Sequence, residues 1–346
     1  MSDFDSSFEG RSLAQLFRPR MVSDPNAKGL DRLLRPSGPR RPSGLGAKAR
    51  LGRVVSRAPE VMVKVTGRPK GKNHVAAHFD YIGRKGELAL ERRGGDILAD
   101  RETRNEVAGM WGDPVYWRDN ATTAAVSMIF SMPQGTDPAK VLASVRAVAQ
   151  TEIEDEWDYV MALHTDTPRP HVHLAVAARG DTGRRFNPRP HTLHHFRERF
   201  AEELRARGVT AEATPRAARG IGRAGQSMAL HQMRQRLRAG TAMQPRANRQ
   251  FRAAVIDDHQ RKTPPPPFVK RSQDSWAEAR RIYLAAADQL AGSGDPDDRK
   301  LADQVRAFVR GGRTPTAHEQ ALAAIERSGE RQRQPERRPK PPDRTR

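Results

Sequence analysis

The residues best suited to chemistry in this chain are three histidines near its middle, His164, His171 and His173. Imidazole nitrogens are good ligands for divalent metal ions, and a site with three protein ligands keeps coordination positions open for a substrate. Single histidines on the surface of a basic protein are ordinary. Two that are separated by one residue, with a third seven positions before them, predict a metal site of the catalytic kind.

The segments around these histidines are expected to form two β-strands, residues 158–164 and 171–178, joined by a turn that contains prolines. Because strand side chains alternate between faces, the histidines of the second strand point away from the apolar residues that separate them. Antiparallel pairing of the two strands then places His164 beside the other two histidines. Asp166 lies in the turn, where it can accept a hydrogen bond from the second nitrogen of one ligand and fix its tautomer.

A candidate nucleophile, Tyr81, lies in a segment with helical periodicity, residues 74–85. In that helix Phe79 and Ile82 face the core, whereas Tyr81 shares a face with His78. A tyrosine on a helix surface usually has no chemical role. In a chain without cysteine that has a three-histidine site, it becomes a candidate to attack a phosphate. The phenol has a pKa near 10, so the attack needs a metal-activated phosphate and a nearby base.

The chain is strongly basic. It has 62 Lys and Arg residues against 41 Asp and Glu, a formal net charge of +21 at pH 7 and a pI of about 11.1. Such an excess favours a polyanionic partner, because phosphate contacts release counterions. Basic tails on a neutral enzyme would give the same total, but positive clusters also occur in residues 64–72 and 216–223. A linker would account nearly as well for the second cluster. The residues expected to contact DNA are Arg68, Lys70, Lys72, Arg84, Lys85, Arg216, Arg219 and Arg223.

Features that the sequence lacks exclude cysteine chemistry and argue against insertion into a membrane. Without cysteine there are no disulfides, thiolate metal ligands or cysteine nucleophiles. No apolar run approaches transmembrane length, and the N-terminus lacks the charged and apolar regions of a signal peptide. We therefore expect a cytoplasmic protein that does not insert into membranes.

Composition and periodicity divide the chain into regions. An apolar strand is expected at residues 124–133, followed by a helix that begins at Pro138 with Asp137 as its cap. Together with the histidine strands these elements indicate an α/β (α+β) fold, a mainly antiparallel sheet of about five strands flanked by helices. The regions are a disordered basic arm (1–57), the α/β domain that carries the histidines (58–225), a basic helical extension (226–263), a polyproline linker (264–271), a small helical region (272–328) and a disordered charged tail (329–346).

The order of these features resembles that of the P-type mobilisation relaxases, DNA-nicking enzymes of conjugative and mobilisable plasmids in the HUH endonuclease superfamily. In related rolling-circle replication initiators the tyrosine typically follows the paired histidines, whereas here Tyr81 precedes them. The resemblance covers about residues 58–225 and rests on three motifs: residues 78–84 look like the first relaxase motif, 127–135 like the central strand and turn, and 164–166 with 170–173 like the metal motif.

The resemblance implies a reaction, the nicking of one DNA strand at a plasmid transfer origin. Tyr81 would form a 5′-phosphotyrosyl link and leave a free 3′-hydroxyl, and the reverse attack would rejoin the strand after transfer. Asp166 would orient a metal-ligand histidine or help to take up the tyrosine proton. The expected cofactor, held by His164, His171 and His173, is one divalent ion: Mg²⁺ or Mn²⁺ according to the family, although three imidazoles also suit other transition metals.

The resemblance also implies partners: single-stranded origin DNA, relaxosome accessory proteins and the coupling protein of a conjugative channel. One position departs from the family pattern. Many members have Asn four residues after the last histidine, where this chain has Ala177. Any hydrogen bond that this Asn makes near the site is missing here.

Three other functions are compatible with parts of the sequence. A replication initiator would need a tyrosine after the histidine motif, and the only one there is Tyr283, far away in the helical region. A DNA-binding accessory protein with a degenerate site would account for Ala177 and the short chain. A metal-dependent phosphohydrolase would use an activated water, so its activity would survive Tyr81→Phe, whereas cleavage by a relaxase would not.

Overall fold

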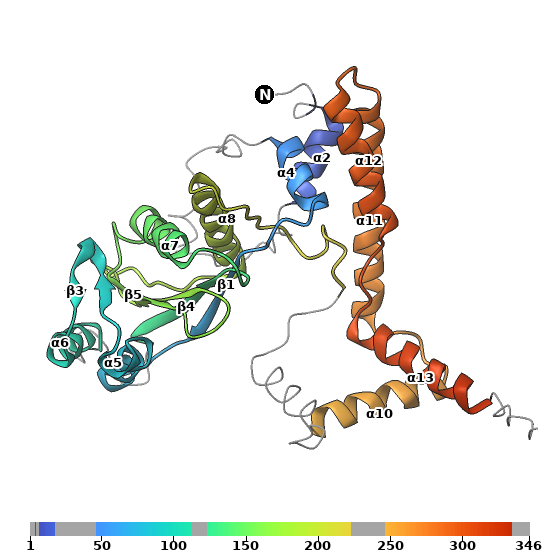
Figure 1. Cartoon of the computed structure of the whole chain (residues 1–346). Coiled ribbons are helices and arrows are strands. Elements are labelled where there is room, and N and C mark those ends of the chain that lie inside the picture. The colour runs from blue at the N-terminus through green and yellow to red at the C-terminus, as the bar shows by residue number, and fades with distance from the viewer. Residues whose placement is uncertain (1–3, 5–6, 18–45, 113–122, 223–245, 334–346) are drawn as a thin grey trace, which may run out of the picture. The chain divides into compact units, whose positions relative to one another are not determined.

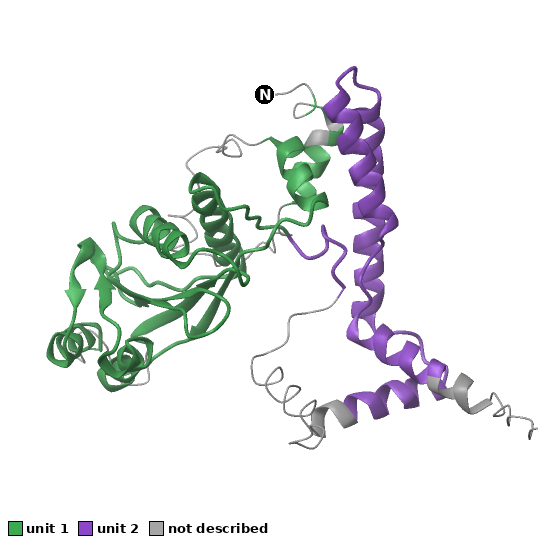
Figure 2. Cartoon of the chain, in the orientation of Figure 1, with its two compact units in different colours: residues 1–214 green, residues 215–346 purple. Residues whose placement is uncertain are grey.

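The structure, a computed structural model, is drawn for the whole chain in Figure 1. The residues that it describes are 4, 7–17, 46–112, 123–222 and 246–333. They belong to two compact units, residues 1–214 and 215–346, each of which is treated by itself below (Figure 2). None of the described helices combines the length and the apolar composition that a membrane span requires.

The first unit is built on a sheet of six strands in which every neighbouring pair is antiparallel. The predicted architecture, a mainly antiparallel sheet flanked by helices, is confirmed. The central strands are buried along nearly their whole length because helices cover both faces of the sheet. In the spatial order β1-β4-β6-β5-β2-β3, the strands are β1 (Met62–Gly67), β4 (Ala125–Ser131), β6 (His171–Ala177), β5 (Tyr159–His164), β2 (Leu90–Arg92) and β3 (Ile97–Leu98).

One face of the sheet packs against α7 (Pro138–Glu152) and α8 (Pro190–Ala206) (Figure 1). The start of α7 confirms the sequence prediction. The Asp137 carboxylate accepts a hydrogen bond of 2.9 Å from the backbone N–H of Ala139, and Pro138 occupies the first helical turn. The core of this face includes the apolar residues that alternate with the histidines on β6, namely Val172, Leu174 and Val176.

The opposite face packs against α5 (Gly71–Ile82) and α6 (Arg101–Gly112) (Figure 1). On this side the sheet presents small buried side chains, so that helices can approach it closely; they include Ala162, Ala175 and Ala177. The apolar stripe of α5, which consists of Val75, Phe79 and Ile82, packs onto them. Burial of this stripe leaves the side of α5 that carries Tyr81 next to the histidines of the sheet.

The helix α5 ends at Ile82, three residues before the end predicted from the sequence. The N–H of Gly83 still bonds to the carbonyl of Phe79 at 2.8 Å, but Arg84 and Lys85 then adopt φ values of 51° and 54°. These values lie in the left-handed region, which a right-handed helix cannot include. The chain therefore leaves the helix here and continues through the short turn η1 (Arg84–Gly86).

The prediction of a disordered arm over residues 1–57 is wrong for two segments, which form α2 (Phe8–Leu16) and α4 (Ala47–Val55). Arg50 and Arg53 of α4 both donate to the carboxylate of Glu212, which is 2% exposed, at 3.0 and 2.9 Å. A buried carboxylate needs such partners. The basic composition that suggested disorder therefore serves in part to hold α4 against a segment far along the chain. Residues 18–45, and residues 334–346 of the predicted tail, lie outside the described residues.

Residues 179–187 form a turn with an isolated bridge between Arg179 and Arg185. Gly183 has a φ of 81°, and its N–H bonds to the carbonyl of Gly180 at 2.9 Å. The N–H of Phe186 also bonds to the carbonyl of Ala178 at 2.9 Å, so the two arms of the turn lie together without forming a regular strand.

The second unit is helical. Its elements are α10 (Arg246–Gln260), α11 (Pro267–Ala291), α12 (Pro296–Arg310) and α13 (Ala317–Arg333). α11 and α12 pack against each other, and the rings of Trp276, Tyr283 and Phe308 meet between them. The predicted polyproline linker over residues 264–271 is too long, because Pro267 already occupies the first turn of α11, where a proline is favoured.

The basic segment at residues 215–222 packs with these helices, although the sequence analysis placed it in the α/β domain. The hydroxyl of Tyr283 donates to the carbonyl of Ala218 at 2.6 Å, and Ile221 pairs with Thr314. The limits of the α/β domain remain a prediction, but the first compact unit ends at Thr214.

Gly220 should be required for this packing. It has a φ of 63°, and a Cβ atom there would lie 3.0 Å from the Trp276 ring. We expect Gly220→Ala to destabilise the helical unit by about 1–3 kcal/mol and to lower its Tm by roughly 5–10 °C. Thermal unfolding of the full chain, followed by Trp fluorescence, measures the effect. Gly294→Ala, where a Cβ would meet nothing within 4 Å, is the matched control and should unfold like the wild type.

The start of α13 is held by a reciprocal cap. The N–H of Thr316 donates to the Glu319 carboxylate at 2.7 Å, and the N–H of Glu319 donates to the Thr316 hydroxyl at 3.3 Å. Arg313 also donates to this carboxylate, at 2.5 Å. Burial alone would raise the pKa of Glu319, but the hydrogen bonds from Arg313 and Thr316 outweigh it and lower the pKa from 4.5 to about 2.

The cap should weaken in acid. Because the pKa of Glu319 is lower in the folded than in the unfolded chain, its stabilising effect is complete above about pH 4.5 and is lost as the pH falls toward 2. The free energy of unfolding of Glu319→Gln, from urea titrations over this range, should therefore fall less with decreasing pH than that of the wild type. Glu326→Gln, at an exposed position, should keep the wild-type slope. Equal slopes for Glu319→Gln and wild type would contradict the prediction.

Candidate active site

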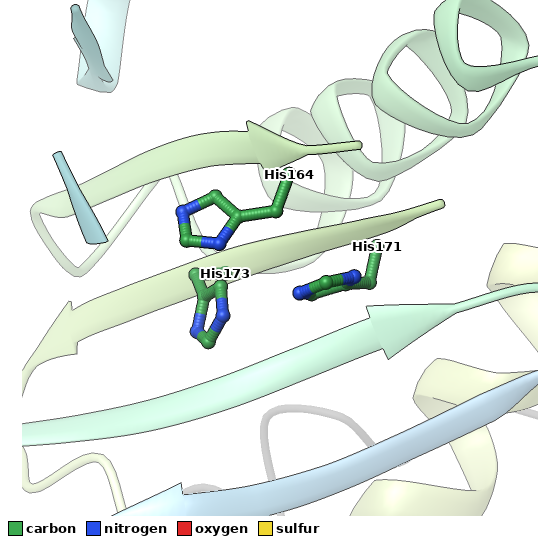
Figure 3. Close-up of side chains that lie close together, drawn as sticks. All are labelled: His164, His171 and His173. Atoms are coloured by element: carbon green, nitrogen blue, oxygen red, sulfur yellow. The ribbon is translucent and has the colours of Figure 1, made fainter. Parts of the chain in front are cut away.

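The three histidines meet where β5 ends and β6 begins (Figure 3). His164 lies opposite His171 in the strand register, and His173 lies two residues further along the same face of β6. The ring centroids are 4.5 Å apart for His164 and His173, and 5.2 Å apart for each of the other two pairs. One nitrogen from each ring lies within 4.8 Å of the others. The convergence that the sequence spacing predicted is therefore present.

The ring nitrogens that face one another fit a metal ion, although the Nδ1 of His164 also lies 3.0 Å from the guanidinium of Arg84. The Nε2 of His164 donates to the carbonyl of Ile82 at 2.7 Å, and the Nδ1 of His171 donates to the carbonyl of Arg169 at 3.0 Å. Each of these rings therefore keeps one lone pair for a ligand bond. The Nδ1 of His173 is buried, and no described residue forms a hydrogen bond with it. Such a buried atom is costly unless it gains a partner, and a metal ion among the three rings would reduce that cost.

The protonation of the rings also suits metal binding. Burial, reinforced by the neighbouring His164 and His171, lowers the pKa of His173 to about 3. Burial likewise lowers the pKa of His164. Both imidazoles are therefore neutral at physiological pH, which is the form that binds metal ions.

Tyr81 lies next to this cluster. Its ring meets the ring of His173 edge to face, with centroids 5.7 Å apart. Tyr81 is nevertheless 56% exposed. The helical periodicity that placed Tyr81 on the polar side of α5 is thus confirmed, and the residue is open to a substrate.

Two residues beyond those predicted from the sequence, His78 and Ser127, lie beside Tyr81 in a short chain of contacts. His78 stacks on the Tyr81 ring with centroids 6.1 Å apart, and its Nε2 shares a hydrogen bond of 2.6 Å with the hydroxyl of Ser127 on β4. Burial lowers the pKa of His78 to about 4, so the ring is neutral. His78 thus lies between Ser127 and the ring of Tyr81. Two features of the sequence could have identified these residues: His78 lies on the same helical face as Tyr81, and Ser127 lies in the motif at residues 127–135.

Arg84 and Asp166 form an ion pair at the edge of the cluster. The guanidinium of Arg84 also lies 3.0 Å from the Nδ1 of His164, and its carbon is 5.9 Å from the centroid of the Tyr81 ring. The sequence predicts two alternative roles for Asp166, the orientation of a ligand histidine or the uptake of the tyrosine proton. In the structure the carbonyl of Ile82 orients His164, because Asp166 pairs with Arg84.

Of the other residues predicted to contact DNA, four lie on the unit that carries the site and the rest do not. Arg68, Lys70, Lys72 and Lys85 are exposed at the two ends of α5. Arg216 and Arg219 belong to the second unit, and Arg223 lies outside the described residues. Ala177, where the family resemblance leads one to expect Asn, is buried opposite Ala125 under α5 and α6, and its small size suits the close helix packing.

Comparison with known proteins agrees with the geometry. A family model described as "Relaxase: MobA/VirD2-like, nuclease domain" matches residues 98–209, which include the three histidines but not Tyr81. The chain is similar to "T-DNA border endonuclease VirD2" of Rhizobium radiobacter, with 26% identity over 201 residues that cover 52% of this chain and 47% of the relative. The protein of the same name from Rhizobium rhizogenes is 27% identical over 185 residues, or 47% of this chain and 42% of the relative. The chain thus spans less than half the length of these relatives.

Proposed function

We propose that this chain is a relaxase of the HUH type that nicks one strand of DNA at a plasmid transfer origin by transesterification onto Tyr81, a proposal that its similarity to the relaxase nuclease model and to the VirD2 endonucleases supports. The observation that carries the proposal is the contact of an exposed tyrosine with a cluster of three histidines, at 5.7 Å between the ring centroids of Tyr81 and His173. An activated phosphate beside a free phenol is what this reaction needs.

The reaction exchanges one phosphodiester for another. The hydroxyl oxygen of Tyr81 attacks the scissile phosphorus, and the bond from phosphorus to the 3′ oxygen breaks. The phosphate stays on Tyr81 as a 5′-phosphotyrosyl link, and the leaving 3′ oxygen takes a proton. Because the number of ester bonds is unchanged, no ATP is required, and attack by a 3′-hydroxyl on the link rejoins the strand. Asp166 is our candidate to help take up the phenolic proton.

The cofactor in this proposal is one divalent ion held by His164, His171 and His173, with Mg²⁺ or Mn²⁺ expected from the family and other transition metals compatible with the ligands. When bound, it would supply positive charge to a non-bridging oxygen of the scissile phosphate. The protein's own contribution is to keep the imidazoles neutral through burial and to fix the orientation of His164 through the Ile82 carbonyl.

The proposed substrate is single-stranded origin DNA. Arg68, Lys70, Lys72 and Lys85 are exposed on the unit that carries Tyr81, where they can contact phosphates. The relatives are named as T-DNA border endonucleases, which supports DNA as the substrate. Relaxosome accessory proteins and a conjugative coupling protein are the proposed protein partners, and the cytoplasm is the proposed location.

The test is cleavage of single-stranded oligonucleotides that tile the transfer origin of the element encoding the chain. Each is labelled at its 3′ end, so that the fragment carrying the 5′ phosphate remains visible, and each is incubated with Mn²⁺ or Mg²⁺, or with EDTA. We expect a labelled covalent protein–DNA adduct with the ion and none with EDTA. Cleavage without an adduct would point to a phosphohydrolase that uses water. Binding without cleavage in either metal would favour the DNA-binding accessory protein.

A further inference from the structure

Arg84 is held at the cluster in an unfavourable backbone conformation. Both Arg84 and Lys85 have positive φ values, of 51° and 54°, without being glycine. Left-handed residues of this kind concentrate at functional sites, where surrounding contacts hold them. Here the side chain of Arg84 touches three groups of the site: the Asp166 carboxylate, the Nδ1 of His164 and the face of Tyr81.

The bond from Arg84 to His164 competes with metal binding. The Nε2 of His164 carries the proton that it donates to Ile82, so the Nδ1 has the ring's single lone pair. Arg84 donates into that lone pair at 3.0 Å. A metal ion would need the same lone pair, and one lone pair cannot serve both. A bound ion therefore requires Arg84 to release His164.

After that release Asp166 still holds Arg84 beside Tyr81. The N–H groups that Arg84 had directed at His164 are then free to donate hydrogen bonds, and the proposed substrate offers phosphate oxygens that accept them. A guanidinium is planar and binds two phosphate oxygens at once, and its charge does not depend on pH in the working range.

We propose that Arg84 has two alternative partners: it occupies the Nδ1 of His164 in the ion-free protein, and in the loaded site it binds the non-bridging oxygens of the scissile phosphate. Asp166 acts as the positioning residue that keeps Arg84 in place in both states. The phosphate-binding half of this proposal depends on the proposed nicking function, whereas the competition with the metal ion does not.

The proposal predicts that Arg84→Ala strengthens metal binding and slows DNA cleavage. Arg84→Ala removes a competitor and a positive charge, so Mn²⁺ should bind about tenfold more tightly. The same variant should cleave about 100- to 1000-fold more slowly, since a charge that stabilises the transition state is lost. A residue with a purely structural role would not increase metal affinity when it is removed.

The experiment has two arms, both on the full chain. Calorimetric titration of Mn²⁺ without DNA compares wild type, Arg84→Ala, Arg84→Lys and the control Arg184→Ala, which removes an exposed arginine. Cleavage of the origin oligonucleotide is then measured for the same proteins, with and without added guanidinium. We expect guanidinium to restore part of the activity of Arg84→Ala alone. Arg84→Lys, which keeps the charge but not the fork of donors, should bind Mn²⁺ like the wild type and cleave slowly. If the alanine variant does not fold, Arg84→Met, which keeps the length of the side chain but has no donor, takes its place and should also bind Mn²⁺ more tightly.

Unchanged or weaker Mn²⁺ binding by Arg84→Ala would overturn the competition. Wild-type cleavage by both Arg84 variants would overturn the phosphate contact. Tighter Mn²⁺ binding in a protein that cleaves no origin DNA, even as wild type, would support the competition and would locate the failure in the proposed nicking function.

Discussion

Replacing Tyr81 by phenylalanine is expected to abolish both strand cleavage and the covalent DNA adduct, with a loss of about 10⁴-fold or more in rate. The substitution removes one oxygen atom, the one that forms the new bond to phosphorus. Tyr81 is 56% exposed and its hydroxyl has no structural partner among the described residues, so the fold and the metal affinity should not change. Denaturing gels of the labelled oligonucleotide measure cleavage and adduct together.

Tyr283→Phe is the matched control for this variant. It also removes a single phenolic oxygen, but from a buried tyrosine in the helical unit, whose hydroxyl bonds to the carbonyl of Ala218. It should cost about 1 kcal/mol of stability and leave the adduct intact. An adduct that survives Tyr81→Phe and disappears in Tyr283→Phe would revive the replication-initiator alternative. Cleavage retained in Tyr81→Phe, without any adduct, would instead identify a water-dependent phosphohydrolase.

Replacing His173 by alanine should have the second largest effect. The expected losses are about 100-fold or more in Mn²⁺ affinity and about 10³-fold in cleavage, because one of three ligands is gone. The effect on stability should depend on the ion. In EDTA the variant loses a buried imidazole whose Nδ1 forms no hydrogen bond with the described residues, which partly offsets the loss of packing.

The Tm measured with and without metal tests this prediction. Mn²⁺ at a concentration about 100 times its Kd should stabilise the wild type by about 2.7 kcal/mol, and the increase in Tm should be largely absent in His173→Ala. His259→Ala, at an exposed position of α10, should behave as the wild type in both conditions. An undiminished increase in the His173 variant would show that the ion binds somewhere other than the three histidines.

Much of the fold follows from local sequence. The two-residue alternation of β5 and β6 and the burial of one side of α5 are properties of short segments, because side-chain direction has a fixed period in each element. The start of α7 at Asp137 is equally local, since a cap bonds to an N–H two residues away. For the same reason the convergence of the three histidines was predictable: a short turn allows the antiparallel register that brings them together.

The groups that surround these residues and hold them in place depend on the tertiary structure. His78 meets Ser127 of another strand, and the helix α4 is held by Glu212, contacts that span 49 to 162 residues of chain and leave no periodic signal. Asp166 pairs with Arg84 because α5 ends early, in a left-handed turn that residue types alone do not specify. The sequence thus determined which groups could hold a metal ion and attack a phosphate. The fold determined what holds each of them in place, because hydrogen bonds and ion pairs depend on distances in space and not on separation along the chain.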